Sequence, residues 1–239
     1  MQYNYVLASA DMILLEKISV FENKLGGSKM STLSDIAELV QKGKAQEVAD
    51  LVSKALDEGI GAQQILDEGL LKGMGELGVK FKNNEVFVPE VLIAARALNK
   101  GTDTLKEKLV DLDVKAVGKV IIATVAGDLH DIGKNLVKLM LEGSGFEVID
   151  LGTDVPADKI VAAVNEYNPD VVALSALLTT TMSAQGDVIK ALEAAGIRDK
   201  VKVIVGGAPI TEAFANEIGA DGFSEDASGA ADAAKSFVQ

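Results

Sequence analysis

Residues 119–145 read KVIIATVAGDLHDIGKNLVKLMLEGSG, and this stretch decides the fold. Its first seven residues form a continuous apolar, β-branched run, which is typical of a strand buried on both faces of a sheet. A short polar loop follows, and a helical stretch comes after the loop. The sequence therefore predicts a strand, a loop and a helix in direct succession, which is the first half of a βαβ unit.

The same alternation continues to the end of the chain. We expect further strands at 146–151, 170–176, 202–207 and 221–224, with helices at 157–167, 184–196, 210–219 and 227–237. Strands that alternate with helices predict a parallel sheet covered by helices on both faces. Five strands in about 125 residues fit a flavodoxin-like, doubly wound (Rossmann-type) α/β domain.

The chain before this domain has helical patterns throughout. Ser34, with acidic residues close behind it, predicts the start of the first of four helices, and Pro89 suits the first turn of the fourth. Four helices with short connections predict an antiparallel bundle. We therefore expect an N-terminal extension at 1–30, a helical-bundle cap domain at 31–112 and an α/β domain at 113–239. Nothing in the sequence of the extension indicates a function.

The composition limits the kinds of chemistry available. The chain is 48% hydrophobic and 25% charged, as in an ordinary globular protein, and its net charge of −13 argues against nucleic-acid binding. The lack of cysteine excludes disulfides, iron–sulfur clusters and cysteine-bound zinc, and a single histidine excludes most multi-histidine metal sites. Because no apolar run reaches the roughly 18–20 residues of a membrane span and no signal peptide is evident, we expect a cytoplasmic protein without a membrane partner.

The unusual residues follow three of the predicted strands. They occupy 126–133 after the first strand, 175–181 after the third and 206–208 after the fourth. In a doubly wound domain, ligands bind at the carboxyl ends of the strands. The sequence therefore predicts a ligand site at this edge of the sheet.

The loop GDLHDIGKN (127–135) contains the only histidine of the chain. It is not a phosphate-binding P-loop, because five residues separate Gly127 from Gly133 instead of four and Asn135 replaces the hydroxyl residue. The Gly-x-Gly-x-x-Gly dinucleotide motif is also absent. A two-carboxylate magnesium site with Asp128 and Asp131 remains open, as does a histidine that only caps the loop.

Asp128 lies two residues before His130, close enough to hydrogen-bond the imidazole and fix its tautomer. No other protein ligand of the type that a bare transition metal demands is available nearby in the sequence. A metal that brings its own equatorial ligands needs only one residue, so a tetrapyrrole-type cofactor fits this pattern.

The pattern Asp128-x-His130-x-x-Gly133 resembles the signature of cobalamin-binding domains. The same resemblance includes Ser175-x-Leu177, the pair Gly206-Gly207 and the helical segment 73–98. Over residues 31–239 the chain is similar to the cap and cobalamin domains of methionine synthase and to the corrinoid methyl-carrier proteins of methylotrophic methyltransferase systems.

This resemblance implies a role for each site residue. His130 would be the lower axial ligand of cobalt, in place of the cofactor's own base, so that cobalamin (as methylcobalamin or cob(I)alamin) is bound base-off with histidine on. Asp128 would hydrogen-bond the imidazole and Thr181 would complete that relay. Asp131 would cap the following helix, and Lys134-Asn135 would only be part of it. The other implied cofactor-binding residues are Gly127, Leu129, Asp131, Gly133, Ser175, Leu177, Thr179, Gly206, Gly207 and Ala227, with Phe81, Val88 and Met74 from the cap.

The resemblance also implies a function. The chain is expected to carry a methyl group on cobalt between a substrate-specific methyltransferase and a second methyltransferase, with tetrahydrofolate or a thiol as acceptor, and to need a reductive activator. It is not expected to turn over alone. Methylamines, methanol, betaines and methoxylated aromatics remain open as donors. A cobalamin sensor or storage protein, or the small subunit of an adenosylcobalamin mutase, is the alternative.

Overall fold

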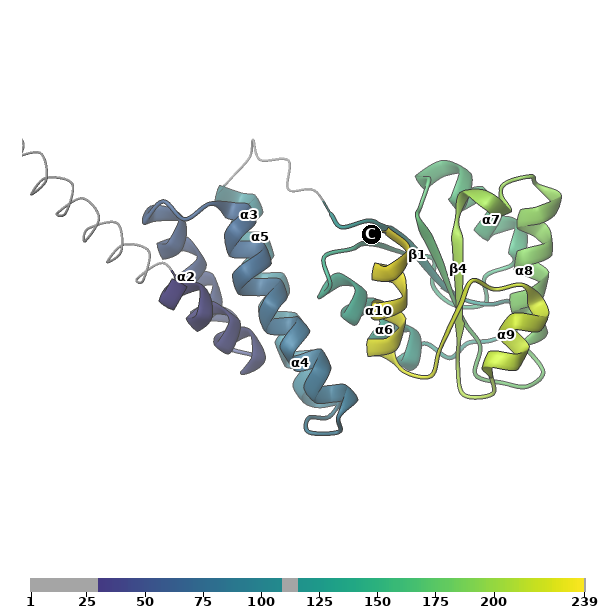
Figure 1. The fold of residues 1–239 in the computed structure, drawn as a ribbon, viewed down its shortest axis with the longest axis horizontal. Helices are drawn as coiled ribbons and strands as arrows, with labels where there is room; N and C mark the ends of the chain where they lie inside the picture. The colour runs from purple at the N-terminus through teal and green to yellow at the C-terminus, as the bar shows by residue number, and fades with distance from the viewer. Residues whose placement is uncertain (1–29, 109–115, 239) are drawn as a thin grey trace, which may run out of the picture.

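The computed structural model describes residues 30–108 and 116–238 of the chain. Figure 1 shows two regions, a helical domain at the N-terminal side and an α/β domain after it. The expected extension lies outside the described residues except for Met30, and the expected boundary between 112 and 113 also lies outside them.

The helical domain contains a helix at 30–41, α2 (Ala45–Asp57), a continuous helix from Ala62 to Lys82 and α5 (Val88–Lys108). The continuous helix consists of α3 (Ala62–Gln64), a π-helical stretch η1 (Ile65–Leu71) and α4 (Lys72–Lys82). This confirms the predicted bundle. The predicted start at Ser34 is wrong, because residues 30–33 are already helical and Leu33 is buried in the bundle core.

A short turn joins α4 to α5. Asn84 in this turn has a left-handed conformation with φ of 58°, which asparagine tolerates better than most residues. Pro89 lies in the first turn of α5, and the side chain of Glu90 accepts a hydrogen bond from the backbone N–H of Phe87. These features stop α4 at Lys82 and leave Phe81 near the tip of the bundle.

The α/β domain has a five-stranded parallel sheet in the order β2-β1-β3-β4-β5, which confirms the flavodoxin-like prediction. The strands are β1 (Lys119–Thr124), β2 (Glu147–Asp150), β3 (Val171–Ser175), β4 (Lys202–Gly206) and β5 (Gly222–Ser224). Thr124 pairs with Ser175, and Ser175 pairs with Gly206. The three loops singled out in the sequence therefore leave the sheet side by side.

Helices cover both faces of the sheet (Figure 1). One face packs against α6 (Ile132–Glu142) and α10 (Ala227–Val238), and the other packs against α7 (Ala157–Tyr167), α8 (Ser183–Ala194) and α9 (Glu212–Ile218). A 3-10 turn, η2 (Arg198–Lys200), precedes β4. Side chains alternate between the faces, so that Ile122 faces the first core and Ile121 the second.

The helical domain contacts the α/β domain through α4. There is no room for a side chain at Gly78 because Met140 of α6 fills that space, and Met74 of α4 does the same at Gly143. The Ser228 hydroxyl of α10 donates a hydrogen bond of 3.2 Å to the carbonyl oxygen of Gly78. This close contact holds the C-terminal end of α4 beside the carboxyl edge of the sheet.

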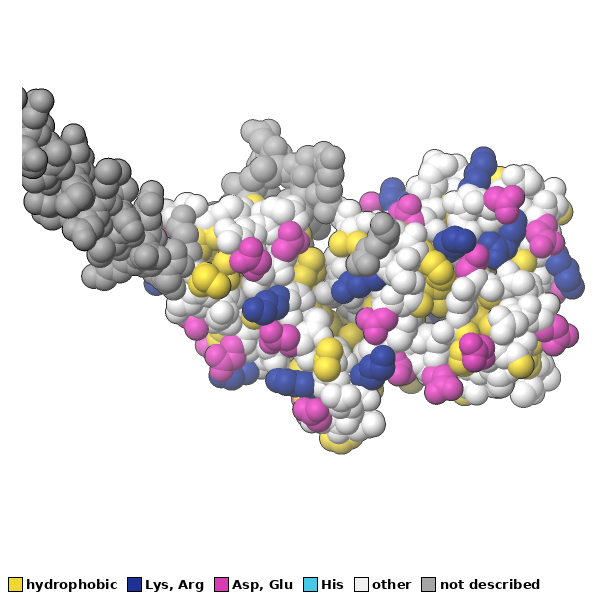
Figure 2. Space-filling model, viewed as in Figure 1, with side chains coloured by type: hydrophobic (Ala, Val, Ile, Leu, Met, Phe, Trp, Pro, Cys, Tyr) yellow, Lys and Arg dark blue, Asp and Glu magenta, His cyan; other side chains and the backbone are white. Residues whose placement is uncertain are grey.

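Acidic and basic side chains are interspersed over the face shown in Figure 2, without a large patch of one sign. In the part of the chain that the structure describes, no helix is both long enough and apolar enough to cross a membrane.

Asp221 gives the α/β domain an acid-sensitive contact at the amino edge of the sheet. Burial alone would raise the pKa of its carboxyl, but hydrogen bonds from the Val203 N–H, Arg198 and Lys202 outweigh burial and lower it. A carboxyl whose pKa is lower in the folded than in the unfolded chain stabilises the fold above the unfolded value, about 3.9 for aspartate. This stabilisation is lost as the pH falls through the folded value.

We therefore expect Asp221→Asn to lower the free energy of unfolding by about 1–3 kcal/mol at pH 7. The difference from wild type should shrink at pH 3, as measured by urea unfolding at both values. Asp187→Asn, which alters an exposed carboxylate 3.8 Å from Lys190, is the control and should change little at either pH. A difference for Asp221→Asn that stays the same at pH 3 would contradict this assignment.

Candidate functional site

The loop after β1 is held in a tight turn by its own backbone. Gly127 has a φ of 80°, which favours glycine, and the Asp128 N–H donates to the carbonyl oxygen of Val125. The Thr124 hydroxyl donates a hydrogen bond of 2.8 Å to the His130 carbonyl oxygen. These contacts bring Asp128 under the loop and leave the His130 ring half-exposed above it.

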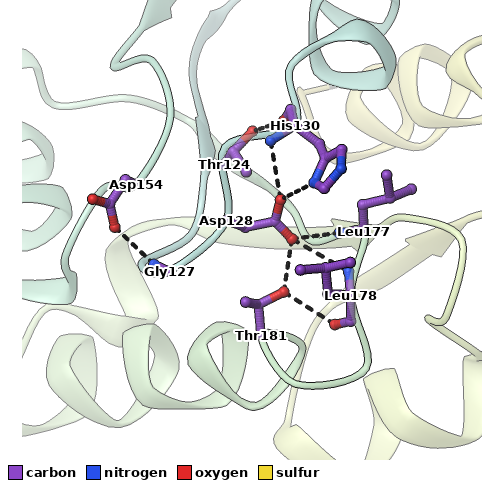
Figure 3. Close-up of polar contacts among 8 residues, drawn as sticks. All are labelled: Thr124, Gly127, Asp128, His130, Asp154, Leu177, Leu178 and Thr181. Atoms are coloured by element: carbon purple, nitrogen blue, oxygen red, sulfur yellow. Dashed lines mark hydrogen bonds and ion pairs between the residues drawn. The ribbon is translucent and has the colours of Figure 1, made fainter.

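Asp128 is fully buried and accepts hydrogen bonds with both carboxylate oxygens (Figure 3). Its Oδ1 lies 3.0 Å from the His130 backbone nitrogen and 2.7 Å from Nδ1 of the His130 ring. Its Oδ2 accepts from the Thr181 hydroxyl at 2.7 Å and from the backbone N–H groups of Leu177 and Leu178 at 2.8 and 3.3 Å. One carboxylate therefore links the loop after β1 to the loop after β3.

The environment of Asp128 keeps it ionised. Burial raises the pKa of this carboxyl, but the hydrogen bonds from Thr181, from His130 and from the Leu177 N–H outweigh burial and hold the pKa well below its usual range. An ionised carboxylate only accepts hydrogen bonds, so the His130 proton lies on Nδ1. The lone pair of Nε2 is then free, and Nε2 has no hydrogen-bond partner among the described residues.

A cavity of about 660 Å³ begins beside His130 and extends along the face of the sheet that α6 and α10 cover. Ten of the residues expected at the site line it: Phe81, Leu129, His130, Asp131, Gly133, Ser175, Leu177, Gly206, Gly207 and Ala227. They come from four separate segments of the α/β domain and from the cap. The structure thus brings together most of the residues singled out in the sequence.

The other expected residues lie elsewhere. Asp128 and Thr181 are buried below the loop, and Gly127 lies at the start of its turn. Thr179 and Val88 are exposed and do not line the cavity. Met74 is buried in the contact between α4 and α6, so it is a core residue in this structure.

Two glycines at the end of β4 allow the neighbouring loops to approach closely. Gly207 has a φ of 127°, and a Cβ atom there would lie 1.8 Å from the Ala176 carbonyl oxygen. A Cβ atom at Gly206 would lie 3.0 Å from the Ser224 carbonyl oxygen. The loops after β3, β4 and β5 therefore approach one another as closely as their backbones allow.

Sequence reasoning missed the floor and one wall of the cavity. Ile122, Ala173 and Ile204 form the floor, and Leu136, Val137 and Ala230 form the wall from α6 and α10. The three floor residues occupy corresponding positions in β1, β3 and β4 and point to the same face. The period of two along each strand was the available signal.

Two residues after the histidine differ from expectation in detail. Asp131 immediately precedes α6, but its carboxylate accepts from the Asn135 side chain and not from a backbone N–H. Lys134 is not merely an element of the helix, because its buried ammonium group lies 2.7 Å from both carboxylate oxygens of Asp150. This ion pair ties the first turn of α6 to the end of β2.

The residues present fit a corrinoid. Within 30–108 and 116–238, no group of three or more His, Asp or Glu side chains is placed to hold a metal ion. One imidazole nitrogen is free at the mouth of the cavity, where the apolar side chains of Leu129 and Ile132 are 74% and 79% exposed. A large planar group with its own metal ligands would cover these side chains, and the cavity behind them would receive a side arm of that group.

Known proteins match both parts of the chain. Two family models described as B12 binding domain match residues 118–233 and 32–106. Dimethylamine corrinoid protein 1 of Methanosarcina acetivorans is 42% identical over 212 residues, which cover 88% of this chain and 99% of that protein. The trimethylamine corrinoid protein of Methanosarcina barkeri is 45% identical over 188 residues, 78% of this chain and 85% of that protein.

Two solved structures are similar over most of the chain. The methanol:cobalamin methyltransferase complex MtaBC from Methanosarcina barkeri has a TM-score of 0.80 at 31% identity, covering 87% of this chain and 80% of that chain. A cobalamin-binding protein from Desulfitobacterium hafniense has a TM-score of 0.73 at 36% identity, covering 87% and 98%. Both similarities extend over the helical and the α/β domain.

Proposed function

This chain belongs to the family of B12-binding corrinoid proteins, and we propose on that basis that it carries a methyl group on bound cobalamin from one methyltransferase to another. The observation that supports this most directly is the free Nε2 of His130 beside a cavity large enough for a displaced nucleotide tail. When bound, the cobalamin supplies a cobalt centre that accepts and releases the methyl group. The protein supplies the site that holds and tunes this centre.

The site residues have distinct roles in this proposal. His130 would hold the cobalt through Nε2, while Asp128 accepts a hydrogen bond from Nδ1 and fixes the ring. The Thr181 hydroxyl donates a hydrogen bond to Oδ2 of Asp128 and so fixes the carboxylate from the side opposite His130. Leu129, Ile132 and Leu177 line the cavity and would give the corrin an apolar surface, and Phe81 of the cap would help to exclude water.

The two domains have separate roles in this proposal. We place the cap within residues 31–112 and the cobalamin domain within 113–239. The cap would cover the bound cofactor and would move aside when a partner docks. Contact between Met140 and Gly78 gives the cap a defined resting position on α6.

The proposed partners are a substrate-specific methyltransferase, a second methyltransferase with a folate or thiol acceptor, and a reductive activator. Because several similar proteins are named as dimethylamine or trimethylamine corrinoid proteins, we propose a methylamine as the donor. Methanol is the second candidate, since one chain of the methanol:cobalamin methyltransferase complex MtaBC is similar to 87% of this chain.

The experiment is a reconstitution with cobalamin under reducing conditions. Dimethylamine, trimethylamine and methanol are each added to the loaded protein, with and without the corresponding Methanosarcina methyltransferase, and methylation of cobalt is followed by visible absorbance. We expect methylation only when a methyltransferase is present, and fastest with an amine. Rapid methylation by the chain alone would refute the carrier role, and failure with every methyltransferase would favour a sensor or storage protein.

Gly133 provides a test of the corrin position. It lines the cavity, and a Cβ atom at this position would meet no other atom within 4 Å. Gly133→Ala should therefore leave the apoprotein as stable as wild type, or up to about 1 kcal/mol more stable, since the residue is in α6. If the corrin lies against this backbone, cobalamin affinity should fall by about tenfold or more, equivalent to about 1.4 kcal/mol.

Gly75→Ala is the matched control for that measurement. Gly75 is in α4, also has open space around it and does not line the cavity. Its substitution should affect neither cobalamin affinity nor the absorbance spectrum. Equal affinities for wild type and Gly133→Ala would place the corrin away from α6 and contradict the proposed position.

A further inference from the structure

The loop between β2 and α7, residues 151–156, lies beside the histidine loop without lining the cavity. Asp154 in this loop makes two contacts with the histidine loop, shown in part in Figure 3. We propose that Asp154 is a positioning residue that fixes the backbone at Gly127 and Asp128, and so sets the orientation of His130. This proposal rests on the proposed role of His130 as the ligand of cobalt.

The two contacts form a closed pair of hydrogen bonds. The Gly127 N–H donates to Oδ1 of Asp154 at 2.7 Å, and the Asp154 N–H donates to the Asp128 carbonyl oxygen at 2.9 Å. Both peptide groups on either side of the Gly127–Asp128 bond are therefore held by one residue. These backbone contacts fix the Cα position of Asp128 independently of the hydrogen bonds that its own side chain accepts.

The backbone conformation of Asp154 is adapted to this contact. Its φ is 53°, in the left-handed region, where aspartate and asparagine are the non-glycine residues most often found. Gly127 opposite it also has a positive φ, of 80°. A left-handed conformation at a non-glycine residue persists only where neighbouring contacts hold it. The hydrogen bonds to the histidine loop are such contacts for the exposed Asp154.

The loop that contains Asp154 is itself anchored at both ends. Asp150 accepts from the Gly152 N–H and from Lys134, and Thr124 donates its N–H to the Gly152 carbonyl oxygen. Val155 donates its N–H to the Thr124 carbonyl oxygen and is buried. Asp154 thus projects from a fixed segment. A residue can position another loop only if its own segment is held in place.

The consequence for His130 follows from the short distances around Asp128. The Asp128 carboxylate must reach Nδ1 of His130 at 2.7 Å and the Thr181 hydroxyl at 2.7 Å at the same time. If the backbone at Asp128 shifts by several tenths of an ångström, one of these contacts lengthens. Loss of the Asp154 contacts would then allow the imidazole to rotate or to change its tautomer.

Three variants separate this role from a general effect on the fold. Asp154→Gly removes the side-chain acceptor but keeps access to the left-handed conformation, so the loop folds without strain. Asp154→Asn keeps an oxygen acceptor and tolerates the same conformation. Asn168→Gly is the control, because Asn168 also has a left-handed φ, of 46°, at the C-terminal end of α7.

The first readout is the tautomer of His130 in the apoprotein. Because the chain has a single histidine, its ring nitrogen signals in a ¹⁵N NMR spectrum need no assignment. At pH 8 we expect wild type, Asp154→Asn and Asn168→Gly to show Nδ1 protonated, as the contact with Asp128 requires. Asp154→Gly should show a several-fold larger fraction of the tautomer with the proton on Nε2.

The second readout is the cobalt(II) EPR spectrum after loading with cobalamin. Nitrogen splitting from His130 should fall by half or more in Asp154→Gly and remain at the wild-type level in the other two variants. If wild type itself shows no such splitting, the ligand role of His130 fails, and the apoprotein NMR result then tests Asp154 independently. A lower melting temperature for Asp154→Gly with wild-type NMR and EPR spectra, or an Asp154→Asn variant that behaves like Asp154→Gly, would overturn the proposal.

Discussion

Replacing His130 with alanine should remove nitrogen splitting from the cobalt(II) EPR spectrum of the cobalamin-loaded protein. In the proposed function Nε2 of His130 binds cobalt, and the half-exposed ring of His130 contacts the Asp128 carboxylate through Nδ1. Loss of a metal-bound nitrogen should weaken cobalamin binding by at least about 10- to 100-fold, the range seen when only the partner of a metal ligand is removed. Affinity is measured by equilibrium dialysis followed by absorbance.

The fold should survive this substitution. Asp128 keeps hydrogen bonds from Thr181, Leu177 and Leu178, so its buried carboxylate is not left without partners. His130→Gly with added imidazole is the matched rescue variant, and the free imidazole should restore nitrogen splitting. A wild-type EPR spectrum for His130→Ala would show that another group binds cobalt.

The substitution Gly207→Ala should abolish cobalamin binding and unfold or distort the carboxyl edge of the sheet. The added Cβ atom would lie 1.8 Å from the Ala176 carbonyl oxygen and 2.8 Å from the carbonyl carbon. Backbone atoms cannot rotate away as a flexible side chain does, so β3 and β4 would have to separate. The φ of 127° adds strain that alanine does not tolerate. We expect a loss of more than about 3 kcal/mol in the free energy of unfolding.

Urea unfolding and a cobalamin titration of the same preparation test this expectation. Gly196→Ala is the control, because Gly196 has a φ of 68° but no other atom lies within 4 Å of the added Cβ. It should show only the conformational cost, about 1 kcal/mol, and bind cobalamin normally. A Gly207→Ala protein with wild-type stability and affinity would contradict the close approach of the two loops.

The parts of the structure that the sequence predicted well depend on short-range patterns. The continuous apolar run at 119–125 predicted β1, and the loop after it contains Asp128 and His130, which meet because they are two residues apart. Thr181 is far from Asp128 in the sequence, and its role was predicted from the family resemblance and not from residue spacing. Thr181 follows β3 and Asp128 follows β1, so their contact depends on how these two strands pair in the sheet. No local sequence pattern specifies that pairing.

The parts that could not be predicted depend on long-range packing. Lys134 reads as a surface residue of a helix until β2 places Asp150 beside it. Asp154 reads as an ordinary loop residue until its left-handed backbone brings its carboxylate to Gly127. Val88 and Phe81 are close in sequence, yet only Phe81 lines the cavity, because the turn between α4 and α5 points the two residues differently.

The parallel register of β1, β3 and β4 gives the sheet two edges at which substitutions should have different consequences. At the carboxyl edge, Thr124, Ser175 and Gly206 lie side by side, and every loop that follows them meets the same cavity. At the amino edge, Asp170 and Asp221 accept hydrogen bonds from the neighbouring strands and contact nothing in the cavity. Substitutions at the carboxyl edge should therefore change cobalamin binding, whereas substitutions at the amino edge should change the stability of the fold and leave the cavity intact.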